Sequence, residues 1–172
     1  MAMHYLLVDG YNIIHANKEL AIVAEDSLEI ARKKLSDALC EFMAMSKYQI
    51  ILVFDAHLVA GGVGSIEDYH NIKIVFTKEA ETADHYIESV AYKLGKKRDR
   101  ITVATSDVLE QIIILGQGAS RISAEDLWQE MESQKEVMRT KYITNKPIKK
   151  NPFESLLDEE TAKKLEEMRY GK

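Results

Sequence analysis

The chain has 172 residues, 46% of them hydrophobic and 30% charged, which is ordinary for one globular domain with a short appendage. No apolar run approaches the roughly 20 residues that span a bilayer, and a strand pattern begins almost at the N-terminus, so we expect neither a membrane span nor a secretory or transit segment. The single cysteine, Cys40, cannot form an internal disulfide. A cytoplasmic location is therefore expected.

The net charge of −5 is unevenly distributed along the chain. Residues 1–134 carry 13 basic and 21 acidic side chains (−8), residues 135–151 carry 6 and 1 (+5), and residues 152–172 carry 4 and 6 (−2). A generic nucleic-acid binder would be basic overall, so this acidic body does not fit that class. The basic segment can still contact a phosphate backbone locally.

Short apolar runs alternate with helical patterns, which is typical of βαβ units and a parallel sheet. The first run, residues 5–8, is followed by an expected loop from Gly10 to about Asn17. Ser27 is then predicted to cap a long amphipathic helix that ends near Ser46.

The middle of the chain repeats this alternation. The second run, residues 50–54, leads into a glycine-rich stretch, residues 60–65, where we expect a flexible loop. The third run is residues 72–76, after which Thr82 is predicted to cap a helix that stops at Gly95.

A fourth apolar run, residues 101–104, precedes Ser106, which can cap a helix to about Leu115. A short fifth strand is expected near residues 119–122, after two glycines. The runs are apolar on both faces, which predicts a sheet covered by helices on both sides. Right-handed crossovers then follow almost by rule.

The C-terminal part is predicted to be helical and separate from the sheet. Ser123 opens a helix to about Lys141, which ends a predicted domain of residues 1–141. Residues 142–172 are predicted to form a basic linker and a tail helix. The apolar residues of this amphipathic tail helix are Phe153, Leu156, Leu157, Leu165 and Met168.

An aspartate lies at or near the carboxyl end of each of the first four strands. The four are Asp9, Asp55, Asp84 and Asp107. In an open parallel sheet these ends converge on one crevice. Four carboxylates there repel each other unless a hard divalent cation neutralises them, and phosphodiester hydrolysis uses Mg²⁺ or Mn²⁺ held by a few carboxylates. The pattern therefore predicts a nuclease.

Each aspartate also has a simpler explanation when it is considered alone. Asp9 and Asp55 can be turn residues. Asp84 and Asp107 can interact favourably with the dipole at the start of a helix. The prediction therefore depends on the set of four. Two neighbouring residues can assist, because Asn12 lies close to Asp9 in the chain, and the Ser106 hydroxyl can hold a water or phosphate if it does not cap a helix.

Other chemistries fit the sequence less well. The five histidines lack zinc-site spacing, no serine lies in a GxSxG elbow, and the glycine-rich stretch lacks the GK[ST] of a P-loop. A phosphatase or receiver-type α/β protein remains a rival, although Asp9-Gly10-Tyr11 departs from the phosphatase DxD motif. A second rival is a module that binds RNA or ribosomes without cutting.

Five short segments together resemble the motifs of NYN-domain ribonucleases, with bacterial YacP-type proteins as the closest branch. The resemblance extends over roughly residues 4–141, with the segments in the family's order and spacing. The segments are Leu7-Val8-Asp9-Gly10-Tyr11-Asn12, Val53-Phe54-Asp55-Ala56, Phe76 to Asp84, Ala104-Thr105-Ser106-Asp107 and Gly116-Gln117-Gly118-Ala119. The resemblance implies a three-layer α/β fold of the PIN-like type, with a parallel sheet of order 3-2-1-4-5 between helices.

The resemblance also implies a function and a site. Family members bind Mg²⁺ or Mn²⁺ and cleave RNA, and YacP-type proteins are linked to mRNA cleavage on translating ribosomes. The implied partners are thus mRNA and the ribosome, without a membrane. The implied catalytic and metal-binding residues are Asp9, Asp55, Asp84 and Asp107, with Asn12 and Ser106 assisting. Candidates for contact with RNA or the ribosome are Lys141, Lys146, Lys149 and Lys150, unless they only belong to a solvated linker.

Overall fold

The computed structural model describes residues 2–56, 64–107 and 118–145. The chain divides into two compact units, Met1–Lys135 and Glu136–Lys172. The first unit holds the sheet and the helices that cover it. Of the second unit, the described residues belong to the C-terminal part of one helix.

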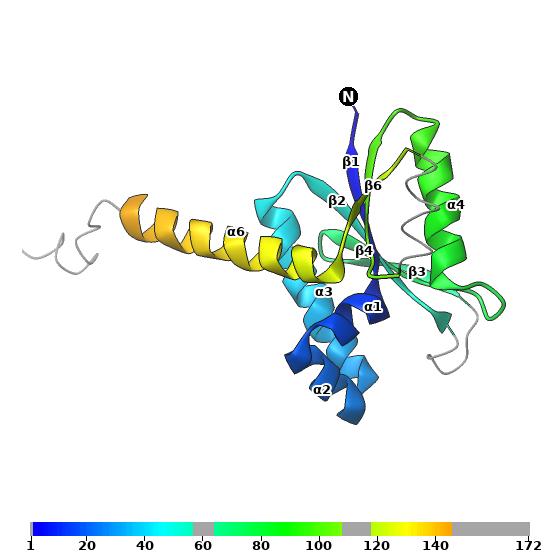
Figure 1. The fold of residues 1–172 in the computed structure, drawn as a ribbon, viewed down its shortest axis with the longest axis horizontal. Helices are drawn as coiled ribbons and strands as arrows, with labels where there is room; N and C mark the ends of the chain where they lie inside the picture. Colours follow the sequence, from blue (N-terminus) through cyan, green and yellow to red (C-terminus); the bar gives the residue numbers. More distant parts are fainter. Residues whose placement is uncertain (1, 57–63, 108–117, 146–172) are drawn as a thin grey trace, which may run out of the picture. The chain divides into compact units, whose positions relative to one another are not determined.

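Within the described residues, six strands form one sheet in the order β3-β4-β2-β1-β5-β6 (Figure 1). Five of them are parallel, and they stand in the predicted order 3-2-1-4-5 once β3 is set aside. The predicted α/β fold is therefore confirmed. The strands are β1 (His4–Asp9), β2 (Tyr48–Phe54), β3 (Ser65–Tyr69), β4 (Ile72–Phe76), β5 (Arg100–Ala104) and β6 (Ser120–Ile122).

The edge strand β3 was not predicted. It pairs antiparallel with β4, and four of its five residues are exposed. A strand without a buried face has no apolar pattern that sequence reasoning can detect. Its last residue, Tyr69, accepts a hydrogen bond at its carbonyl from the partly buried thiol of Cys40 (3.6 Å).

The two faces of the sheet bury separate apolar cores, as the strand pattern predicted. Along β1, Leu6 and Val8 point into the core beneath α1, α2 and α3, whereas Leu7 points into the core beneath α4. Successive residues of a strand face opposite sides, so one apolar run serves both cores. Figure 1 shows α4 on one side of the sheet and α3 on the other.

The predicted loop from Gly10 to Asn17 is wrong, because two helices follow β1 directly. Helix α1 covers Gly10–Ala16, α2 covers Lys18–Asp26 and α3 covers Leu28–Met45. Asn17 ends the first helix and caps the second, since its side chain accepts a hydrogen bond from the N–H of Leu20 (3.1 Å). Ile13 and Ile14 of α1 are buried. The helix has only 7 residues, which is too short for a helical pattern of apolar residues to be recognised in the sequence.

The helices after β4 and β6 begin at the predicted caps. Thr82 caps α4 (Ala83–Gly95) through the N–H of His85 (3.2 Å). Ser123 accepts from the N–H of Asp126 (3.1 Å) at the start of α6 (Ala124–Asn145), which runs slightly beyond the predicted end. Trp128 of α6 donates its indole N–H to the carbonyl of Ile13 (3.0 Å), which fixes the start of α6 against α1.

Several predictions fall outside the described residues. These are the helix after Ser106, the tail helix of residues 153–168 and most of the glycine-rich loop. Gly64, at the end of that loop, has φ +78°. In the part of the chain that the structure describes, no helix is both long and apolar enough to cross a membrane.

Gly10 is the first residue of α1, directly after β1, and packing explains why this position is a glycine. A Cβ at this position would overlap the ring of Phe54, the last residue of β2. Gly10 is not among the residues with positive φ, so the missing side chain matters more than the backbone freedom. The close approach brings α1 against the end of β2.

We expect Gly10→Ala to lower the free energy of unfolding by about 1–3 kcal/mol, because the added methyl group must displace the Phe54 ring. Urea denaturation measures this loss. Gly95→Ala is the matched control, since nothing lies within 4 Å of a Cβ there, and its effect should be neutral or slightly stabilising. Equal stability of the two variants would contradict the close approach at Gly10.

Candidate active site at the carboxyl ends of the strands

The register of the central strands brings Asp9, Asp55 and Asp107 to one edge of the sheet. Asp9 ends β1 and lies opposite Val53, two residues before Asp55. On the other side of β1, Val8 lies opposite Ala104, three residues before Asp107. Parallel strands in this register end at the same level, so the segments that follow them share one rim.

Two hydrogen bonds of the buried Thr77 join the segments that leave β2 and β4. Its N–H donates to the carbonyl of Phe54 (3.1 Å), and its hydroxyl accepts from the N–H of Ala56 (3.0 Å). The intervening residue, Asp55, is thereby held at the end of β2. The chain continues from Thr77 to α4, whose second residue is Asp84.

The segment after β5 is fixed in a similar way. The N–H of Thr105 donates to the carbonyl of Ile122 (3.1 Å), and its hydroxyl accepts from the N–H of Asp107 (3.1 Å). Asn12 of α1 accepts a hydrogen bond from the N–H of Ser106 (2.7 Å). The turn that carries Asp107 is therefore tied to the helix that follows Asp9.

The electrostatics of Asp9 show that the four aspartates share one environment. Burial, and then the negative charge of Asp84, raise the pKa of Asp9 to about 7, and Asp107 and Asp55 add to this. A hydrogen bond from the backbone N–H of Asn12 opposes the rise in pKa. The fold thus places Asp84, Asp107 and Asp55 close enough to Asp9 for their charges to raise its pKa.

These side chains suit a hard divalent cation by their chemistry. Carboxylate oxygens are the ligands that Mg²⁺ and Mn²⁺ prefer, and a cation would relieve the repulsion felt by Asp9. Within the described ranges, no three His, Cys, Asp or Glu side chains are placed so that together they could hold a metal ion. Mg²⁺ does not need one, because it keeps several waters and binds through one or two carboxylates.

The hydroxyl of Ser106 has a structural contact that the sequence did not indicate. It accepts a hydrogen bond from the N–H of Ala124 (3.3 Å), the first residue of α6. Ser106 is otherwise exposed, beside the Asp107 turn. The same residue therefore joins the candidate site to the start of α6.

Sequence reasoning missed the threonines described above and a basic residue on α3. Arg32 donates a hydrogen bond to the hydroxyl of Tyr11 (3.1 Å), and its guanidinium lies 5.9 Å from the ring centre of Phe76. The charge of Asp55 contributes to the raised pKa of Tyr11, after the larger effect of burial. Arg32 lies 20 positions beyond Asn12 on another helix, so no local motif could reveal it, whereas the threonines directly follow strands.

The four candidate lysines come after the site residues in the sequence. Lys141 is an exposed residue of α6 in the second unit. Lys146, Lys149 and Lys150 lie outside the described residues.

We expect Asp9→Asn to stabilise the metal-free protein by about 1–3 kcal/mol at pH 8. Folding raises the pKa of this acid from 3.8 to about 7, so the charged form destabilises the folded state increasingly as the pH rises through that window. Below about pH 4 the gain should vanish. Urea denaturation in a chelating buffer at several pH values measures this dependence.

The matched control for this measurement is Asp68→Asn, because Asp68 is exposed and its ion pair with Lys73 contributes little in water. Its stability should stay close to that of the wild type at every pH. An Asp9→Asn protein that is no more stable than the wild type at pH 8 would contradict the repulsion at the rim.

Comparison with known proteins identifies the family. The sequence model of the YacP-like NYN domain matches residues 6–170. A Bacillus subtilis (strain 168) protein named uncharacterized protein YacP is 41% identical in an alignment of 172 positions that covers 98% of each chain.

Solved structures agree with the sequence match. The crystal structure of Rae1 (YacP) from Bacillus subtilis superposes with a TM-score of 0.72 and 40% identity, over 98% of this chain and 96% of that one. A mutant of the same protein gives 0.71 and 39%, over 85% and 87%. With the family match covering most of the chain, and the fold agreeing, the protein belongs to the YacP-like NYN domain family.

Proposed function

We propose that the protein is a metal-dependent endoribonuclease that cleaves mRNA in association with the translating ribosome. One observation carries the proposal: at the carboxyl end of the sheet, burial and the charges of Asp84, Asp107 and Asp55 raise the pKa of Asp9 to about 7. Membership of the YacP-like NYN domain family indicates a nuclease or RNA-related function. Carboxylates gathered in this way suit metal-assisted phosphodiester hydrolysis.

In this proposal the chain supplies the ligands and the scaffold. Asp9, Asp84 and Asp107 would hold one or two Mg²⁺ or Mn²⁺ ions, and Asp55 would bind directly or through water. The bound ion would lower the pKa of a water and polarise the scissile phosphate. The hydrogen bonds of Asn12 to Ser106 and to Asp9 keep two of the ligand-bearing segments in place.

The charge of the protein is the argument for a larger assembly. Residues 1–134 have a balance of −8, from 13 basic and 21 acidic side chains, and such a body repels free RNA at long range. Binding to the ribosome would offset this repulsion by raising the local concentration of mRNA. We propose Lys141, Lys146, Lys149 and Lys150 as contacts to ribosomal RNA.

We expect Asp84→Asn and Asp107→Asn each to reduce RNA cleavage at least 100-fold, since metal-based charge stabilisation is worth several kcal/mol. The assay is cleavage of an mRNA with Mg²⁺ or Mn²⁺, both free and during translation. Asn12→Ala should have a smaller effect, about 10- to 100-fold, because it acts through the position of the ligands.

A thermal shift on adding Mn²⁺ separates the proposal from its rivals. The wild type should gain stability, and the two aspartate variants should not. Binding of RNA without metal-dependent cleavage would favour a non-catalytic module. Turnover of p-nitrophenyl phosphate without RNA cleavage would favour a phosphatase.

Changing the four lysines to glutamine should reduce co-sedimentation with ribosomes and make it less sensitive to salt. Each lost phosphate contact should lower the slope of log affinity against log salt by nearly one for a helical RNA. The matched control changes Lys18, Lys33 and Lys34, with Lys47, to glutamine, because these four are exposed elsewhere. Unchanged co-sedimentation of the first variant would remove the lysines from the proposal.

A further inference from the structure

A cluster of positive charge lies at the end of α4 and in the turn to β5. Residues 93–100 hold five basic and one acidic side chain, a balance of +4, so the rest of residues 1–134 holds eight basic and 20 acidic side chains, a balance of −12. The five basic residues are Lys93, Lys96, Lys97, Arg98 and Arg100, which we call the α4 basic cluster. The overall negative charge of the chain conceals it.

The side chains of the α4 basic cluster are exposed, and hydrogen bonds hold the backbone of its turn. All five side chains are exposed, and among the described residues none of them forms an ion pair with an acid. The N–H of Arg98 donates to the carbonyl of Gly95 (3.2 Å), and Arg98 holds a left-handed φ of 61°. The single acid, Asp99, accepts a hydrogen bond from the N–H of Met3 (3.0 Å), which ties the turn to the chain before β1.

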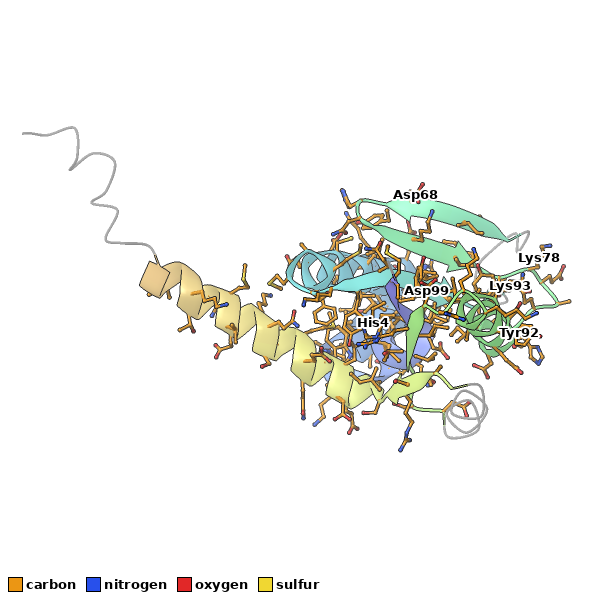
Figure 2. All side chains as sticks on the ribbon, turned by 90° about the horizontal axis from the view of Figure 1, so that it is seen from above. His4, Asp68, Lys78, Tyr92, Lys93 and Asp99 are labelled. Carbon is orange, nitrogen blue, oxygen red and sulfur yellow. The ribbon has the colours of Figure 1, made fainter. Side chains whose placement is uncertain are left out.

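An exposed aromatic ring lies within this cluster. Tyr92 is 56% exposed, and the Nζ of Lys96 lies 4.5 Å from the centre of its ring. Tyr92 and Lys93 project from α4 into solvent (Figure 2). An exposed ring among cations is the combination by which proteins bind single-stranded nucleic acid, with bases stacked on the ring and phosphates on the cations.

A hollow of about 440 Å³ adjoins the cluster at the amino ends of β1, β5 and β6. Its lining includes Gly95 at the end of α4, Asp99 in the turn, and His4, Arg100 and Ser120 at the starts of the three strands. A cavity of this size lies within the range of small-molecule sites and can hold a nucleotide. Arg100 is thus the one member of the cluster that lines the hollow among the described residues.

Helix α4 connects this surface to the candidate active site. Asp84 is in its first turn and Gly95 is its last residue, so the helix of 13 residues spans about 20 Å between them. His85, Ser89 and Tyr92 are exposed at spacings of four and three, which places them on one face. This face runs along α4 from its first turn, which contains Asp84, to the basic cluster.

We propose that Tyr92 and the α4 basic cluster form a second RNA-binding surface, which holds a single strand of RNA about 20 Å from the aspartates. Tyr92 stacks on a base, and the cations contact the phosphates on either side. The RNA ligand rests on the proposed nuclease function. The surface explains how an acidic protein can hold RNA near a negatively charged site.

The first test measures binding without cleavage. The probe is a fluorescein-labelled oligouridine of about 20 nucleotides in a chelating buffer, titrated by anisotropy at several salt concentrations. Changing Lys93, Lys96 and Lys97 to glutamine should weaken binding about 10- to 100-fold near physiological salt and lower the salt slope by about two. The matched control changes Lys18, Lys33 and Lys34 of α2 and α3, which removes the same charge from exposed positions.

Tyr92 has its own pair of variants. Tyr92→Ala should weaken binding about 5- to 100-fold, because stacking of a base is lost, whereas Tyr92→Phe should bind like the wild type. Unchanged unfolding curves check that the variants fold. Equal binding by the basic-cluster variant and its control, or no loss with Tyr92→Ala, would overturn the proposal.

Cleavage measured with the same variants identifies the source of the RNA. Parallel loss of binding and of cleavage of free mRNA would assign the surface to the substrate strand. Intact cleavage of free mRNA, with lost co-sedimentation of ribosomes, would assign it to ribosomal RNA. A wild type that binds RNA through this surface but never cleaves it would refute the proposed nuclease function and support the RNA-binding surface. Cleavage of RNA without binding at this surface would support the nuclease function and refute the surface.

Discussion

The repulsion among four carboxylates at one end of the sheet is the constraint on which the site depends. Asp9 is partly enclosed at the end of the central strand, and burial together with Asp84, Asp107 and Asp55 raises its pKa to about 7. A fold gains nothing in stability from such an arrangement. Such a group of carboxylates at the crevice of a parallel sheet is the pattern expected when stability is given up for a binding or catalytic function.

Neutral hydrogen bonds hold these charges in place. Thr77 and Thr105 fix the segments after β2 and β5 through their hydroxyls, and Asn12 reaches across to the N–H of Ser106. The contact of Gly10 with Phe54 draws α1 onto the sheet beside them. The pKa of Asp9 is raised by its burial and its acidic neighbours, and a bound cation would lower it.

The distribution of charge gives the first unit two distinct ends. The carboxyl ends of the strands carry the aspartates, and the α4 basic cluster lies near the amino ends, with α4 between them. The phosphates of RNA are repelled at one end and attracted at the other, so electrostatic attraction is confined to the basic cluster. The net charge of the whole chain, −5, hides this asymmetry.

The sequence by itself determined the parallel strands, their order through the family resemblance, the caps at Thr82 and Ser123, and the aspartates that follow the strands. These signals are local, because apolar runs and capping residues act over a few positions. It did not reveal β3, whose stability comes from pairing with β4 rather than from a buried face, or α1, which is held by packing on the sheet. Only the tertiary structure could bring Arg32 to Tyr11 and Asn12 to Ser106, since each pair joins residues that the chain separates and only packing brings together.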